Sequence, residues 1–201
     1  MDLDGMLKID NQGEMPIRRG DFLLAEPLLK EDFFSRAVVL ILDFDANNGI
    51  MGLTLNKLTS LTLADIIKGW EQGQRIPIYC GGPVDTERLF MLHSLGDKFS
   101  GSVEICPGIF VGGKLDDIVN YINEGGVIEG KMRFFLGYSG WGSGQLQDEL
   151  ENDTWALVHR ADDSLEDILR GQDNAFWRRE VERLGPRYRS WLIVPQNPEE
   201  N

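Results

Sequence analysis

The segment with the greatest chemical potential is GYSGWGSGQLQDEL, residues 137–150, where a predicted buried strand leads into closely spaced glycines and then a predicted helix. Free backbone amides at such a helix start could hold a phosphate or carboxylate. The glycine spacing matches neither the dinucleotide fingerprint nor the P-loop, which needs Gly-Lys-Ser/Thr where this chain has Gly144-Gln145-Leu146. The favoured interpretation is therefore structural, with glycines letting the backbone pass around Trp141, and the anion pocket is the alternative.

Ser139 is the nearest candidate nucleophile in this segment. A hydrolase elbow, G-x-S-x-G, would require glycine at position 141, which is Trp141. The imidazole bases on offer are His93 and His159, and His93 lies in the apolar strand segment 90–93. A satisfied structural histidine is common in such a place. The sequence therefore argues against a Ser/His triad.

A second glycine element, CGGPV at residues 80–84, follows a predicted strand and has the composition of a tight turn. We expect residues 138–144 to lie beside this turn, and the two elements together to form a surface for a ligand or partner. A buried structural role is favoured for Trp141 over a contact with a partner. The candidate surface consists of Gly81, Gly82, Pro83, Ser139, Gly140, Trp141, Gly142, Gly144 and Gln145.

Metal and redox sites have little support in the sequence. Cys80 and Cys106 are too far apart for a C-x-x-C motif and too few for a disulfide framework, so both are expected to be buried thiols in a reducing compartment. Two distant histidines and two distant cysteines form no ligand cluster. Adjacent carboxylates such as Asp116-Asp117 diverge on a helix and form no acid/base pair. No metal and no cofactor are expected.

The charge of the chain restricts its partners. With 201 residues and a net charge of −13, the chain should repel nucleic-acid phosphates and anionic lipid. Acidic residues gather at 148–167 and basic ones at 170–189, which predicts two solvated faces that partly neutralise each other, or alternatively a docking surface. The apolar run 37–42 is too short to span a membrane, and the N-terminus does not resemble a signal peptide. A cytoplasmic location is expected.

The elements that must position these residues are mostly short strands. Strands are predicted at 22–26, 37–44, 50–56, 76–80, 88–93, 103–106, 109–111, 132–138 and 155–158, with a hairpin loop at 45–49. Helices are predicted after Thr62 through Trp70, from Leu115 to Ile122, after Ser164, and at 174–184. We expect a mobile arm at 1–18, one domain at 19–194 and a polar tail at 195–201. One continuous core should bury Leu40, Leu42, Ile66, Ile67, Ile118, Val119, Phe135 and Leu136.

Several blocks in order resemble the AlgH family, also called YqgE-like: GDFLLAEPLLKEDFFSRAVVLIL, GIMGLTLNK, YCGGPV, LFMLHSL and FFLGYSGWGSGQLQDELENDTW. The resemblance covers residues 19–184. It implies an α+β fold, compact and single-domain, with a mostly antiparallel, barrel-like sheet and packed helices. The family often has an acid followed by histidine after the central strand, where this chain has Asp43-Phe44. The family carries the label of transcriptional regulator, and it implies no catalytic residues.

Three functions are consistent with these observations. The favoured one is a noncatalytic binding or regulatory module whose partner is a protein or a small anionic ligand. The second is an enzyme with an unrecognised site near the two glycine elements. The third is a direct DNA-binding regulator, which would have to use the basic segment 178–189, where glutamates interrupt the arginines.

Overall fold

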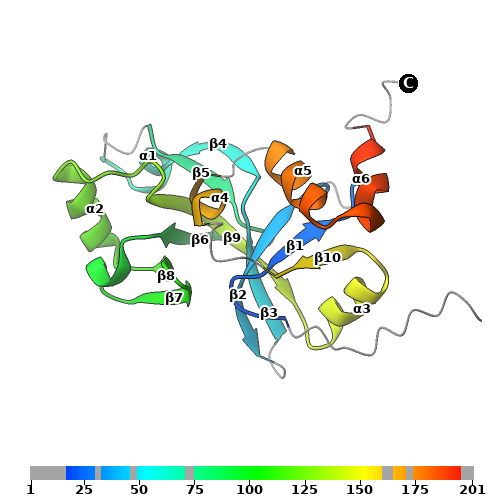
Figure 1. The fold of residues 1–201 in the computed structure, drawn as a ribbon. Helices are drawn as coiled ribbons and strands as arrows, with labels where there is room; N and C mark the ends of the chain where they lie inside the picture. The colour runs from blue at the N-terminus through cyan, green and yellow to red at the C-terminus, as the bar shows by residue number, and fades with distance from the viewer. Residues whose placement is uncertain are drawn as a thin grey trace, which may run out of the picture.

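A computed structural model describes residues 17–29, 33–45, 49–70, 75–159, 165–170 and 174–195. Its centre is a 10-stranded sheet in the order β10-β1-β2-β3-β9-β6-β8-β7, with β4 and β5 attached beside β9. The sheet curls into a half-barrel, and β9 crosses from one half of the molecule to the other (Figure 1). The strands are β1 Phe22–Ala25, β2 Val38–Asp45, β3 Gly49–Thr54, β4 Leu58–Thr62, β5 Pro77–Cys80, β6 Val84–His93, β7 Ser102–Cys106, β8 Ile109–Gly112, β9 Met132–Trp141 and β10 Trp155–Val158.

The strand pairing is antiparallel except between β5 and β9, which run parallel. The predicted hairpin is confirmed, because Asp45 pairs with Gly49 across β2 and β3. β4, with the sequence LTSLT, was not predicted, because its apolar and polar residues do not alternate regularly. In the structure its two leucines, Leu58 and Leu61, are exposed. The molecule is a compact α+β single domain with a mostly antiparallel sheet, as the resemblance implied.

The helices of the described residues are α1 Leu63–Ile66, α2 Leu115–Asn123, α3 Gln145–Glu151, α4 Leu165–Arg170, α5 Asn174–Arg183 and α6 Arg189–Ile193. α2 confirms the prediction from its apolar spacing. α1 starts after Thr62 as expected, and Thr62 forms a capping box with Asp65. The predicted extension to Trp70 is wrong, because Ile67 is already extended. Ser164, the predicted cap of α4, lies outside the described residues, as do most of the predicted arm and tail.

The expectation of one continuous core is wrong, because the sheet separates the buried side chains into clusters. Neighbouring residues of β9 point to opposite faces, so Phe135 packs with Leu40 and Leu42 while Phe134 packs with Ile118 of α2. A third cluster lies under α3. Ile66 is 36% exposed, since α1 ends after one turn. The clusters still belong to one domain, because β9 contributes to all of them.

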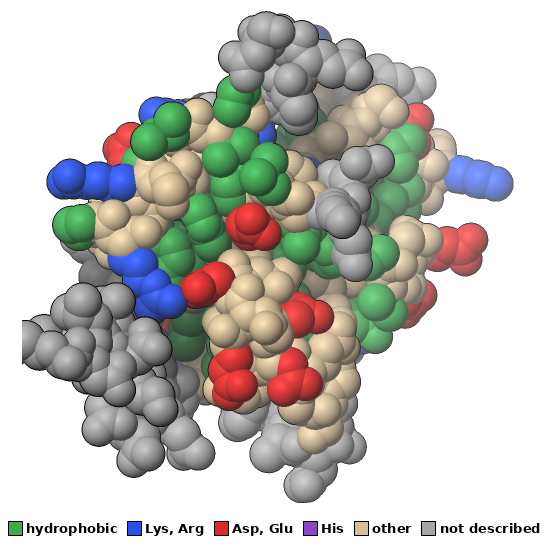
Figure 2. Space-filling view, turned by 90° about the vertical axis from the view of Figure 1, so that its right-hand side faces the viewer, with side chains coloured by type: hydrophobic (Ala, Val, Ile, Leu, Met, Phe, Trp, Pro, Cys, Tyr) green, Lys and Arg blue, Asp and Glu red, His purple; other side chains and the backbone are tan. Residues whose placement is uncertain are grey.

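Charged side chains are distributed as two interacting segments. On the face that carries α3 and α6, Asp and Glu side chains gather on one area (Figure 2). Arg187 donates to Asp153 at 2.8 Å, which joins the acidic segment to the basic one. Within α5, Arg183 pairs with Glu180 at 2.6 Å. Among the described residues, no helix is long and apolar enough to cross a membrane.

Candidate functional site

The two glycine elements lie side by side, as predicted. The amide of Gly81 donates to the carbonyl of Leu136 at 2.8 Å, and the amide of Thr54 donates to the carbonyl of Gly81, also at 2.8 Å. A Cβ on Gly82 would overlap the Tyr138 carbonyl group. Glycine is therefore required where this turn crosses the backbone of β9.

The segment predicted as a loop after Tyr138 is instead the end of β9, which continues to Trp141. It stays extended because Ser139, Gly140 and Trp141 pair with β3, a partner far away in sequence. Ser139 is fully buried. Its hydroxyl donates to the Gly81 carbonyl at 3.1 Å and lies 3.1 Å from the Thr54 hydroxyl. This hydroxyl ties the turn to the sheet and is not accessible as a nucleophile.

Trp141 is 5% exposed and packs edge-to-face on Trp155. Its indole N–H donates to Glu149 Oε2 at 2.7 Å, and the indole N–H of Trp155 donates to the same oxygen at 2.8 Å. The favoured structural role of Trp141 is confirmed. The role of Glu149 was missed, although a buried indole N–H requires an acceptor, and a glutamate in the helix that follows is a natural candidate.

The helix start offers less to an anion than the sequence suggested. Gly144 has φ +78 and precedes α3, so glycine suits this left-handed position. The amide of Gly142 donates to Gln145 Oε1 at 3.0 Å, and Gln145 Nε2 in turn donates to Glu149 Oε1 at 2.9 Å. The Gln145 side chain thus already accepts the hydrogen bond of one backbone amide that an anion would need. The carboxylates of Asp148 and Glu149 would also repel an anion bound at the start of this helix.

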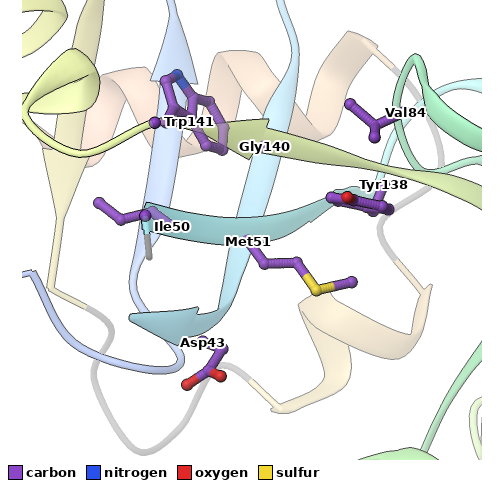
Figure 3. Close-up of a pocket in the computed structure, with 9 residues that line it drawn as sticks. Asp43, Ile50, Met51, Val84, Tyr138, Gly140 and Trp141 are labelled. Atoms are coloured by element: carbon purple, nitrogen blue, oxygen red, sulfur yellow. The ribbon is translucent and has the colours of Figure 1, made fainter. Parts of the chain in front are cut away.

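A pocket of about 460 Å³ opens beside these residues (Figure 3). Of the predicted surface, Gly140, Trp141 and Gly142 line it, whereas Gly81, Gly82, Pro83, Ser139, Gly144 and Gln145 do not. Val84 and Tyr138 also line it, and both belong to the two predicted glycine elements, 80–84 and 138–144. Sequence reasoning missed the lining residues from β2 and β3, which are Asp43, Gly49, Ile50 and Met51.

The pocket is lined by a cross-strand row in which Gly140 carries no side chain. Asp43 pairs with Met51, and Met51 pairs with Gly140, so these three residues lie next to one another on one face of the sheet. A Cβ on Gly140 would stand 3.2 Å from Cε2 of Tyr138. Val84, which pairs with Tyr138, limits the other side. The gap over Gly140 is thus bounded by Met51, Tyr138 and Val84.

The lining of this pocket combines apolar and polar groups. Asp43 accepts two hydrogen bonds from Arg19, at 3.1 and 2.5 Å, so its charge is balanced. The Tyr138 ring packs edge-to-face on Phe90, with centroids 6.0 Å apart. Figure 3 shows Tyr138 on the neighbouring strand to Met51. Such a lining can take up an apolar group and orient it with one or two polar contacts.

The remaining candidates for chemistry serve the structure. His93 is fully buried, with Nε2 2.9 Å from the Ser102 hydroxyl and Nδ1 accepting the Leu95 amide at 3.2 Å. Burial lowers the pKa of His93 to about 4, so the ring is neutral. This confirms the structural interpretation of His93. Neither Cys80 nor Cys106 is part of a disulfide, and both are only partly buried, so the expectation of two buried thiols is wrong. No metal-binding group of His, Cys, Asp and Glu is present in the part of the chain that the structure describes.

Comparison with known proteins agrees with the resemblance found in the sequence. The profile of a family described as AlgH-like matches residues 22–189. A UPF0301 protein of Bacteroides thetaiotaomicron is 39% identical over 199 residues, covering 98% of both chains. One from Chlorobium limicola is 38% identical over 183 residues, covering 91% of this chain and 94% of the relative.

Two solved structures share the fold. The solution structure of the AlgH protein from Pseudomonas aeruginosa has a TM-score of 0.67 and 26% identity, covering 88% of this chain and 94% of that one. A crystal structure of a Corynebacterium diphtheriae protein has a TM-score of 0.69 at 20% identity, covering 89% and 93%. The second comparison bears on the fold alone.

Proposed function

This chain belongs to the AlgH-like family, and on this basis we propose that it is a noncatalytic binding or regulatory module of the cytoplasm. Its partner is a protein that inserts an apolar side chain into the gap over Gly140. The observation that carries this proposal is the cross-strand row Asp43–Met51–Gly140, which lines a pocket in the surface of the sheet and in which Gly140 has no side chain.

The size and walls of the pocket support binding of a side chain. Its volume of about 460 Å³ lies within the range of small-ligand sites, roughly 300–1,000 Å³. Met51, Val84 and Ile50 supply apolar contact area, and burial of an apolar group contributes about 25 cal/mol for each Å² removed from water. Asp43 and Tyr138, which also line the pocket, offer a carboxylate and a hydroxyl for polar contacts that orient the partner.

The groups nearest the pocket favour binding over catalysis. The Ser139 hydroxyl faces the interior and is held by Gly81 and Thr54. The Asp43 carboxylate is held by an ion pair with Arg19. A small anion is a weaker candidate for this pocket than a protein segment, because none of the residues that line it is cationic.

The proposal is tested by selecting a displayed random heptapeptide library on the purified protein. We expect enriched peptides to share an apolar anchor residue, and Gly140→Val to abolish their binding, because the valine side chain fills the gap. Met51→Ala should weaken binding about tenfold, because it removes an apolar wall. Val127→Ala is the matched control, because Val127 is 59% exposed and does not line the pocket.

Urea unfolding of each variant separates lost binding from lost structure. Peptides that bind Gly140→Val as well as the unchanged protein would contradict the proposed site. Turnover of a substrate that Gly140→Val blocks without loss of stability would favour the enzyme alternative instead.

A further inference from the structure

Two arginines, Arg36 and Arg178, contact the C-terminal segment 192–195 away from the pocket lining, and Lys57 lies beside the backbone of Arg36. Arg36 has φ +52, which is unusual for a residue other than glycine. The buried Asn56 holds this turn, because its Nδ2 donates to the Arg36 carbonyl at 2.8 Å and its Oδ1 accepts the Val38 amide at 2.9 Å. Strain of this kind persists only where the surroundings enforce it, so the position of Arg36 is tightly determined.

Neutral carbonyl groups accept hydrogen bonds from all three cations. Arg36 Nη2 donates to the carbonyls of Val194 and Pro195 at 2.9 and 2.8 Å. Arg178 Nη1 donates to the Leu192 carbonyl at 3.2 Å. Lys57 Nζ donates to the Ser35 carbonyl, next to Arg36, at 2.7 Å. The end of α6 is thus capped by cations, as suits the negative end of a helix.

The arrangement places like charges together without a close counter-ion. Arg36 is 8% exposed. Burial and then the charge of Arg178 lower its pKa, while burial and then the charge of Arg36 lower the pKa of Lys57. Within the described ranges, no carboxylate pairs with Arg36 or Lys57, and Arg178 has only an exposed pair with Glu182 at 3.7 Å. A chain of net charge −13 that gathers cations in this way fits an anionic ligand.

We propose that Arg36, Lys57 and Arg178 form a binding site for a phosphate group, carried by inorganic phosphate or by a small phosphate monoester. Two guanidinium groups and one ammonium group match the charge and the several acceptor oxygens of a dianion. The ligand competes with the carbonyls of Val194 and Pro195 for Arg36, because hydrogen bonds to an ionised acceptor are roughly twice as strong as those to a neutral one. Binding therefore loosens the end of α6. This site is independent of the proposed function at Gly140.

The test is an NMR titration of backbone amides with sodium phosphate, compared with sodium chloride at the same ionic strength. We expect saturable shifts at residues 35–37, 57, 178 and 192–194. Lys57→Gln should weaken binding about tenfold, because it removes one charge-assisted contact. Lys68→Gln, which removes an exposed lysine just after α1, should change the affinity less than about twofold.

Phenyl phosphate in a parallel titration distinguishes a monoester from the free ion, since tighter binding of phenyl phosphate shows that the organic group also makes contacts. Arg36→Gln should abolish binding, but it also removes the cap of α6, so Lys57→Gln is the decisive variant. The proposal is overturned if phosphate and chloride give the same shifts, or if Lys57→Gln binds phosphate like the unchanged protein. Shifts confined to Gly142–Leu146 would overturn it too, because they would place the anion at the start of α3.

Discussion

Removal of the Glu149 carboxylate should destabilise the whole layer between α3 and the sheet. Glu149 Oε2 accepts the indole N–H groups of Trp141 and Trp155, which are 5% and 3% exposed. A hydrogen bond to a charged group contributes about 1.5–3 kcal/mol, and Glu149 is itself partly accessible to water, so the lower figure applies to each bond. Glu149→Ala should therefore lower the free energy of unfolding by about 3 kcal/mol.

Equilibrium urea unfolding, followed by tryptophan fluorescence, measures this loss as a lower midpoint at unchanged slope. Glu149→Gln keeps one acceptor oxygen without the charge and should lose about half as much. Glu151→Ala is the control from the same helix, because Glu151 accepts only an exposed bond from Gln147 at 3.1 Å, and it should cost less than about 0.5 kcal/mol. If Glu149→Ala and Glu151→Ala unfold at the same urea concentration, the argument that Glu149 anchors the tryptophans is refuted.

Further predictions concern the core, the buried histidine, the glycine turn and nucleic acid. Ile118→Ala should cost about 2–5 kcal/mol by leaving a cavity, whereas Ile66→Ala should cost less than about 1 kcal/mol because Ile66 is 36% exposed; equal losses in chemical denaturation would contradict this. The pKa of His93 is lowered to about 4, so between about pH 4 and 6.5 the unfolded chain binds more protons than the folded one. Stability should therefore fall by up to about 3 kcal/mol as the pH drops through this window, and a His93→Gln variant that keeps the same pH slope would exclude His93 as the cause. Gly82→Ala should cost about 3 kcal/mol or more in urea unfolding, because its Cβ overlaps the Tyr138 carbonyl; near-native stability would show that the turn can move. The purified protein should show no submicromolar affinity for arbitrary duplex DNA at physiological salt in fluorescence anisotropy, since a net charge of −13 repels the phosphate backbone.

Patterns within short segments of the sequence determined the helix, the hairpin and the turn that depend on neighbouring residues alone. The apolar spacing of residues 115–122 specified α2, because one stripe of a helix must be buried whatever packs on it. The polar residues at 45–49 specified the hairpin between β2 and β3. The apolar residues around His93 in the sequence predicted that its ring has a structural role. The two glycine elements were predicted to lie side by side because glycine allows two backbones to cross closely.

The pocket depends on the order of the strands and on the register in which they pair, and neither can be predicted from a single segment of the sequence. A bulge between Ile41 and Asp43 brings Asp43 opposite Met51, and the pairing of β3 with β9 adds Gly140 to the same row. A shift of one residue in either pairing would turn these side chains to the other face of the sheet. The cluster likewise joins Arg178 to Arg36 and Lys57, which lie more than a hundred positions earlier in the chain, and only the packing of α5 and α6 brings Arg178 close to Arg36.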